Sequence, residues 1–197
     1  MMSSKFEREE NGKIKIIFTT QESQVLINLL EQLLELLGEP SISEPDPLFN
    51  LLGITGNELP PDDPVLRRLL PSAYKDEKDA AEFRRYTEQG LREKKRANAH
   101  LIYEALIPSE EDWSGDQPLN KSTLLINVER DQIPAWLSSL NDLRLALAVR
   151  LGIGESESPN VSKESYELMV DSDPMKAVYA VYSWLGWLQQ SLLDLLN

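Results

Sequence analysis

The chain contains no cysteine among its 197 residues and a single histidine, His100. The absence of cysteine excludes disulfides, zinc–thiolate sites and thiol nucleophiles, and it is typical of cytoplasmic proteins. A metal centre or a proton relay at His100 would need partners, and no second histidine accompanies it. We therefore interpret His100 as an ordinary helical residue and expect no metal and no cofactor.

Long apolar runs are also absent. No segment approaches the roughly 18 uninterrupted apolar residues of a membrane span. The first residues, MMSSKFEREENG, lack the apolar core of a secretory signal. These absences predict a cytoplasmic protein without membrane contact.

Catalytic motifs are missing too. The sequence has no GxxxxGK[ST] phosphate loop, no GxGxxG after a strand, no GxSxG and no HExxH. Its acidic clusters at 9–10, 110–112 and 171–173 are interpreted as solvated loops and helix caps, because paired catalytic carboxylates need a shared desolvated pocket. The sequence thus leans away from an enzyme and leaves the catalytic residues unknown.

Acidic residues are plentiful, with 33 Asp and Glu against 20 Lys and Arg, a formal net charge of −13. This charge disfavours non-specific binding to nucleic acid. Half of the basic residues, ten of 20, lie within 67–96, and seven of these ten lie on a predicted long helix from Asp76 to about Ile107. Its packing stripe is predicted to contain Phe83, Thr87, Gly90, Ala97, Leu101 and Ala105. Four other residues share its opposite side: Arg85, Arg92, Arg96 and Tyr103.

That basic side has two interpretations. It is a solvated face held by i,i+4 pairs such as Glu88–Arg92, or it binds an acidic protein partner.

The stretch 131–151, DQIPAWLSSLNDLRLALAVRL, is predicted to be the central helix of the fold. Asp131 suits its N-cap, and Pro134 is tolerated in its first turn. The helix is apolar on one face throughout and on both faces in its second half, so other elements should surround it. Arg144 interrupts the main apolar face. It is interpreted as a snorkelling arginine or as a buried one that is paired, for structural reasons, with a carboxylate or with helix-end carbonyls. The other interpretation is the ligand-binding group of a pocket for an anion.

The remaining pattern predicts a mainly α fold: residues 1–12 as a flexible N-terminus and 13–197 as a single helical domain. The domain is a bundle of five to seven helices with a small two-stranded antiparallel β ribbon, formed by Lys13–Phe18 and Ser122–Val128. A capping box at Thr19–Glu22 begins a helix that buries Val25, Leu26, Leu29, Leu33 and Leu36 and ends at Gly38. Three Asp-Pro pairs each predict a helix start, at 46–47, 63–64 and 173–174.

The last helix, from Pro174 to about Leu196, is predicted to bury one face through Val178, Val181, Leu185, Leu188 and Leu192. Trp187 points almost the opposite way. A large apolar side chain gains about 1.5–3 kcal/mol from full burial, so Trp187 is expected to meet another part of the chain, a second copy in a homodimer, or a partner. Within the chain, the expected covers are the short helices after Asp46 and Asp63.

Four stretches resemble one known family: DPLFNLLGI (46–54), DPVLRRLLPSAYKDEKDAAEFRRYTEQGLREKKRANA (63–99), LNDLRLALAVRLGI (140–153) and AVYAVYSWLGWLQQSLL (177–193). The family is an uncharacterised actinobacterial one, domain of unknown function 2017, and the similarity covers nearly the whole chain after residue 12. The resemblance implies a cytoplasmic location and names no reaction. Genes of the family often lie near the gene of the substrate-selecting adaptor of the Clp protease. This proximity indicates a link to regulated proteolysis.

Our functional hypothesis is a non-enzymatic cytoplasmic interaction or adaptor protein that binds a protein partner. The alternative is an enzyme or a binding protein for a small anionic ligand, with its pocket around Arg144.

Overall fold

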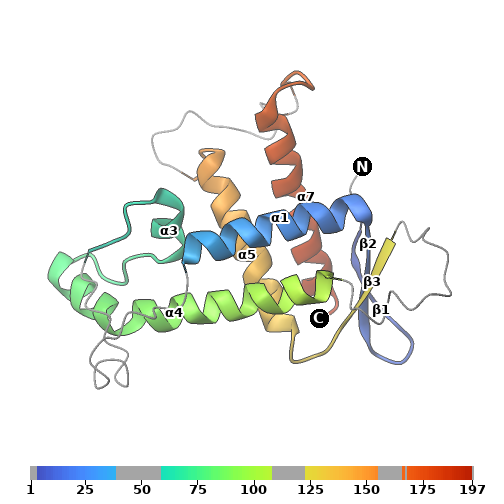
Figure 1. Ribbon diagram of the computed structural model, residues 1–197, viewed down its shortest axis with the longest axis horizontal. Helices are drawn as coiled ribbons and strands as arrows, with labels where there is room; N and C mark the ends of the chain where they lie inside the picture. Colours follow the sequence, from blue (N-terminus) through green and yellow to red (C-terminus); the bar gives the residue numbers. More distant parts are fainter. Residues whose placement is uncertain (1–3, 39–58, 108–122, 155–165, 167, 197) are drawn as a thin grey trace.

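The computed structural model describes residues 4–38, 59–107, 123–154, 166 and 168–196. In these ranges the chain forms three strands and five helices, which confirms the prediction of a mainly helical fold (Figure 1). The helix predicted after Asp46 and the acidic loop at 108–121 lie outside the described residues.

The sheet consists of β1 (Phe6–Arg8), β2 (Ile14–Thr19) and β3 (Thr123–Val128), antiparallel and in that order. The predicted pairing of β2 with β3 is confirmed, in a register that places Ile16 opposite Ile126. Alternate side chains face the core, as a half-buried strand requires: Phe6, Ile14, Ile16, Phe18, Ile126 and Val128.

Strand β1 was not predicted and lies in the segment that we expected to be flexible. Phe6 is buried, its ring meets that of Trp136 edge-on at 5.4 Å, and its backbone N–H donates to Ser191 Oγ. Three residues are too few to show the alternation that identifies a strand in sequence. The ribbon is therefore a three-stranded sheet, held against the helices by Phe6.

Helix α1 (Thr20–Leu37) begins at the predicted capping box, in which Thr19 Oγ1 accepts from the Glu22 N–H and Glu22 bonds back to the Thr19 N–H. It ends at Gly38, whose φ of 75° favours glycine. Its buried positions are Leu26, Leu30, Leu33 and Leu37. The observed buried face is shifted by about one residue from the predicted one. Leu29 and Leu36, which were predicted to be buried, are only half-buried.

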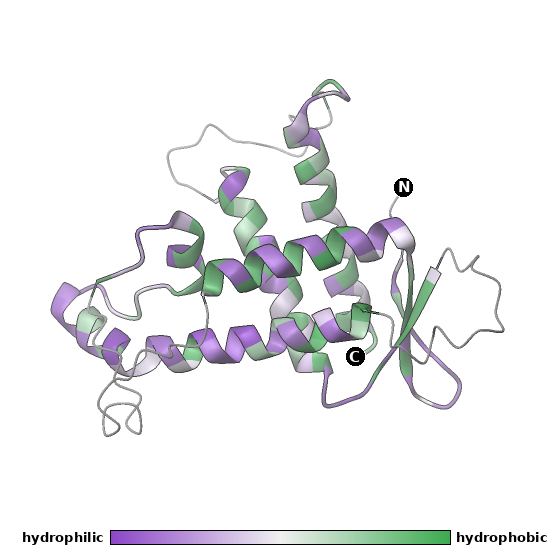
Figure 2. Cartoon of the chain, viewed as in Figure 1, coloured by the Kyte–Doolittle hydropathy of each residue, from purple (hydrophilic) through white to green (hydrophobic). Residues whose placement is uncertain are grey.

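Helix α4 (Glu77–Leu106) begins at Asp76 as predicted and runs unbroken through Gly90, antiparallel to α1 (Figure 1). Its predicted packing stripe was wrong, because Phe83, Gly90 and Ala97 are exposed. The buried positions are instead Ala80, Arg84, Glu88, Ala99, Ile102 and Leu106. Figure 2 shows that the first two thirds of α4 consist mostly of polar residues. Two of them, Arg84 and Glu88, are nevertheless buried.

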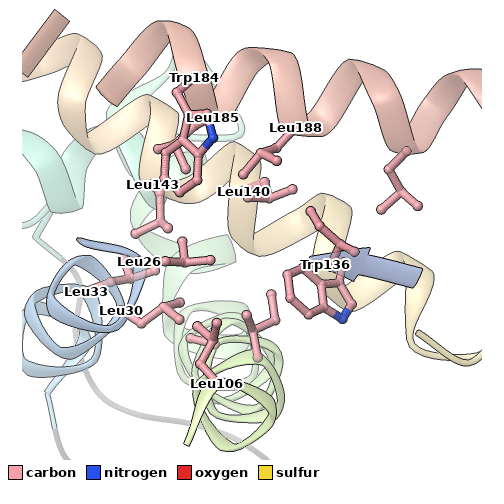
Figure 3. Close-up of a cluster of buried hydrophobic side chains, with 14 of the residues drawn as sticks. Leu26, Leu30, Leu33, Leu106, Trp136, Leu140, Leu143, Trp184, Leu185 and Leu188 are labelled. Atoms are coloured by element: carbon pink, nitrogen blue, oxygen red, sulfur yellow. The ribbon is translucent and has the colours of Figure 1, made fainter. Parts of the chain in front are cut away.

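Helix α5 (Ile133–Arg150) is central, as predicted. It contacts α1, α3 (Pro64–Leu69), α4 and α7 (Pro174–Asp194). Figure 3 shows Trp136, Leu140 and Leu143 of α5 between side chains from α1, α4 and α7. The predicted cap was wrong: Gln132 is the N-cap, and its side chain accepts from the Glu129 N–H instead of capping the helix.

Helix α7 runs antiparallel to α5 (Figure 1). Leu185, Leu188 and Leu192 are buried as predicted, and Val178 and Val181 are half-buried. The Asp-Pro prediction is confirmed at α3 and α7, where Asp63 and Asp173 accept hydrogen bonds from first-turn N–H groups. None of the helices in the described ranges combines the length and the apolar character that a membrane span needs.

Candidate interaction surface on helix α4

The buried side of α4 carries an ion-pair network. Arg84 and Glu88 are only 6% and 5% exposed, and Arg84 Nη1 lies 3.0 Å from Glu88 Oε2. Arg84 also donates to Ser72 Oγ at 3.0 Å and, more weakly, to the Leu70 carbonyl at the end of α3. A charge this deep is tolerated only when it is paired. The network therefore connects α3 and the following turn to α4.

The predicted basic side of α4 faces α1 over most of its length. Arg92 bonds Glu88 through Nε and Nη2, and its Nη1 donates to the Leu37 carbonyl at 3.2 Å. Arg96 donates to the Leu34 carbonyl at 3.4 Å. These carbonyls belong to the last turn of α1, where partial negative charge accumulates. The predicted i,i+4 pair Glu88–Arg92 is confirmed, and Arg92 and Arg96 stabilise the end of α1.

Tyr103 continues the same line of contacts toward the sheet. Its hydroxyl donates to Glu31 Oε1 at 3.0 Å, and this hydrogen bond raises the pKa of Tyr103 above its ordinary value. The partner-binding role predicted for Arg85, Arg92, Arg96 and Tyr103 stays a prediction. The last three have a structural task in the protein itself.

A second ion pair joins α4 to α5. Lys95 Nζ lies 2.6 Å from Asp142 Oδ1, and the two side chains are 13% and 2% exposed. Burial raises the pKa of Asp142 even though Lys95 opposes the shift. Among the residues that the structure describes, Asp142 Oδ2 and Ser139 Oγ are buried and have no hydrogen-bond partner. Sequence placed Asp142 on the polar side of the central helix and did not reveal its partner, because Lys95 is distant in the chain.

Arg144 lies between α5 and α7. Its Nη1 donates to Gln189 Oε1 at 2.6 Å, and its guanidinium carbon lies 5.2 Å from the centre of the Tyr182 ring. Gly186 gives it room, since a Cβ there would come within 3.4 Å of Arg144 Nε. The expected carboxylate or carbonyl partner was wrong: an amide and an aromatic face replace it, and the side chain is half-buried. Its ligand-binding role stays a prediction.

Three aromatic side chains are exposed at the start of α4, and we call Tyr74, Phe83 and Tyr86 the aromatic surface. They are 51%, 43% and 50% exposed. Tyr74 and Phe83 meet edge-on at 5.6 Å, and the guanidinium of Arg85 lies 6.0 Å from the Tyr86 ring centre. With Asp79 and Glu82 they line a cavity of about 360 Å³. Exposed Tyr and Phe beside a half-buried Arg are residue types that are enriched in interface cores.

Trp187 on α7 is 52% exposed. Among the described helices, α3 was an expected cover, but its principal helix contact is with α5. The expected cover after Asp46 lies outside the described residues. A partner or a second copy at Trp187 stays a prediction.

Sequence analysis missed the aromatic surface because Phe83 was assigned to the packing stripe. The available signal was the lack of large apolar residues around it: in 76–90 Phe83 and Tyr86 are the only large apolar side chains, so no apolar stripe is available to bury them. Within the described ranges, no group of three His, Asp or Glu side chains is arranged to hold a metal ion.

The chain is similar to one protein family and to several named proteins. A family model described as Domain of unknown function (DUF2017) matches residues 3–196. The oxidative stress regulator AosR of Mycobacterium tuberculosis (strain H37Rv) is 30% identical over 199 residues, which cover 95% of this chain and 84% of that protein. The putative oxidative stress regulator AosR of Mycobacterium leprae is 31% identical over 200 residues, covering 93% and 82%. No solved structure matches the chain.

Proposed function

The chain belongs to the family described as Domain of unknown function (DUF2017), and from that premise we propose that it is a regulatory protein that acts by binding a protein partner. The names of its mycobacterial relatives support regulation as the role. Non-enzymatic adaptor action, and the link to regulated proteolysis, are the finer parts of this proposal.

The aromatic surface is the observation that carries the proposal. An isolated exposed apolar residue needs no explanation, but three half-exposed aromatic side chains line one open depression here. Phe83 also lines a neighbouring pocket together with the buried pair Arg84 and Glu88, so this part of the surface adjoins a fixed network. A preorganised aromatic surface binds a partner with little loss of conformational entropy.

Charge favours a protein over a nucleic acid as this partner. The net charge of −13 repels phosphate, and Asp79 and Glu82 stand at the aromatic surface itself. The expected partner segment carries an apolar anchor for the space between the rings and a basic residue to meet these two carboxylates.

The relatives' connection with oxidative stress has one consequence here. These 197 residues contain no cysteine, so a thiol switch within them is excluded.

A pulldown from native lysate tests the proposal when recovery is compared between variants. The wild type is compared with the double variant Phe83→Ala, Tyr86→Ala and with the matched control Leu168→Ala, which also removes an exposed apolar side chain. We expect a partner that the double variant loses and the control retains, with unchanged thermal midpoints. Equal recovery by all three proteins would contradict a role for the aromatic surface.

The same experiment addresses the finer proposals. Components of a protease or its adaptors among the surface-dependent partners would support the link to regulated proteolysis. A thermal-shift screen of anionic metabolites addresses the alternative function at Arg144, where a ligand-induced shift that Arg144→Ala abolishes would favour a small-molecule site.

A further inference from the structure

A cavity of about 350 Å³ lies at the end of the molecule opposite the aromatic surface, between the β1–β2 hairpin, the turn from β3 to α5 and the end of α7. Its apolar lining comes from Ile14, Val128, Ile133 and Leu196. The first three of these are buried core residues, so this wall belongs to the folded core. The volume falls within the range of about 300–1,000 Å³ that small-molecule sites occupy.

The charged lining of this cavity is basic, unlike the chain as a whole. Arg8, Lys13 and Arg130 line it, against one acid, Glu129. In a protein with a net charge of −13, such a local excess of positive charge stands out. The first turn of α5 begins at Ile133 in the cavity wall and adds partial positive charge from the helix dipole.

Two of the three cations are available to a ligand. Arg8 is engaged, because its guanidinium donates to the Leu195 carbonyl at the end of α7. Within the described part of the chain, the side chains of Lys13 and Arg130 form no ion pair or hydrogen bond. The nearby acid Glu9 is engaged by Lys15 at 3.0 Å and by Asn11, and Lys13 interacts with it electrostatically without forming an ion pair.

The hairpin loop that carries Lys13 is held in place. Asn11 Oδ1 accepts from the Lys13 N–H, and the backbone of Glu9 bonds Lys13 and Gly12. Gly12 adopts a φ of +84°, a conformation that favours glycine, and it lines the cavity without a side chain. The site is therefore formed before any ligand arrives.

We propose that this cavity binds a small amphiphilic anion. Lys13 and Arg130 contact its phosphate or carboxylate group. Leu196, which is 48% exposed, contacts its apolar body above the buried core residues Ile14, Val128 and Ile133. An inorganic anion would satisfy the cations but leave Leu196 in water, and a neutral apolar compound would leave the cations unpaired. Only a molecule with both parts matches the lining. The inference does not depend on the proposed function.

Calorimetric titration with short synthetic probes tests the site. Hexyl phosphate and hexanoate carry the two candidate anionic groups on the same chain, inorganic phosphate lacks the chain, and hexylamine reverses the charge. We expect saturable binding of at least one of the two amphiphilic anions, tighter than that of inorganic phosphate, and no binding of hexylamine. The anionic group that binds more tightly identifies the ligand class.

Variants then locate the binding. Lys13→Gln combined with Arg130→Gln should weaken binding of the anion by about tenfold or more, because both residues are exposed and their loss removes charge without disturbing the core. Lys94→Gln, an exposed charge on α4, is the matched control and should bind as the wild type does. Failure of both amphiphilic anions to bind, or equal affinity in the double variant, would overturn the proposal. The proposal would also be overturned if inorganic phosphate or hexylamine bound as tightly as the two amphiphilic anions.

Discussion

Glu22 closes the capping box of α1 and also accepts hydrogen bonds from the hydroxyl and the N–H of Ser4. Burial alone would raise the pKa of this carboxyl, but the hydrogen bonds from Thr19 and Ser4 outweigh it and lower the pKa below 4.5. Its contribution to stability is therefore present above pH about 4.5 and is lost as the pH falls through the folded-state pKa.

We predict that Glu22→Gln lowers the free energy of unfolding at pH 7 by about 0.5–2 kcal/mol, the range for a lost helix cap. The same variant should lose less stability than the wild type between neutral pH and pH about 3, because the titrating group is gone. Urea denaturation over this pH range is the measurement. An identical acid dependence in both proteins would show that Glu22 is not the group responsible.

The pair Lys95–Asp142 gives a second residue-scale prediction. Asp142→Ala should cost about 3–5 kcal/mol, because it leaves the Lys95 charge without its carboxylate partner in a largely buried position. The double variant Lys95→Met, Asp142→Ala should be more stable than Asp142→Ala, since neither charge remains. Denaturant unfolding of both variants and of Lys95→Met forms the cycle. Additive effects of the two single changes would contradict a coupled pair.

Arg92 allows a prediction at the scale of helix packing. Arg92→Ala removes two bonds to Glu88 and one to the last turn of α1, so we expect a loss of about 1–3 kcal/mol. Lys94→Ala on the exposed side of α4 is the control and should change stability by less than about 0.5 kcal/mol. Thermal and urea unfolding measure both. If Arg92→Ala proved neutral, the basic side of α4 would be free for the partner role first assigned to it.

Gly90 is the weakest residue of α4 in intrinsic terms. It is exposed, the helix runs through it unbroken, and an added Cβ would have no neighbour within 4 Å. We predict that Gly90→Ala stabilises the protein by about 0.4–1 kcal/mol, because alanine loses less conformational entropy on folding. An increase in the thermal midpoint is the expected readout. A decrease would indicate that α4 needs its flexibility there.

Local signals in the sequence predicted the helix starts well. Thr19, Asp63, Asp76 and Asp173 cap their helices, because a cap depends only on residues within one turn. The buried side of α4 was assigned wrongly because its charged residues were taken to be solvated. Arg84 and Glu88 are buried through contacts with α3 and the following turn, and such pairings are absent from local periodicity. The aromatic surface was missed by the same error.

At the scale of the whole molecule, Trp187 distinguishes self-association from other roles. Because its side chain is half-exposed, Trp187→Ala should change the free energy of unfolding by less than about 0.5 kcal/mol. Sedimentation of wild type and variant across concentration is the measurement. Concentration-dependent association of the wild type alone would support the homodimer, and a marked loss of stability would show that the chain itself covers Trp187.

The contacts between α1 and α4 also determine how far the start of α4 lies from the sheet. Tyr103, Arg96 and Arg92 contact Glu31, Leu34 and Leu37 in turn, so three side-chain contacts follow one another along the two antiparallel helices. Leucines repeat along α1 and alone would tolerate a slip by one turn, about 5.4 Å, whereas these three contacts would all break together. Together the three contacts fix the register of α1 against α4. The aromatic surface at the far end of α4 is thereby kept at a constant reach from the sheet.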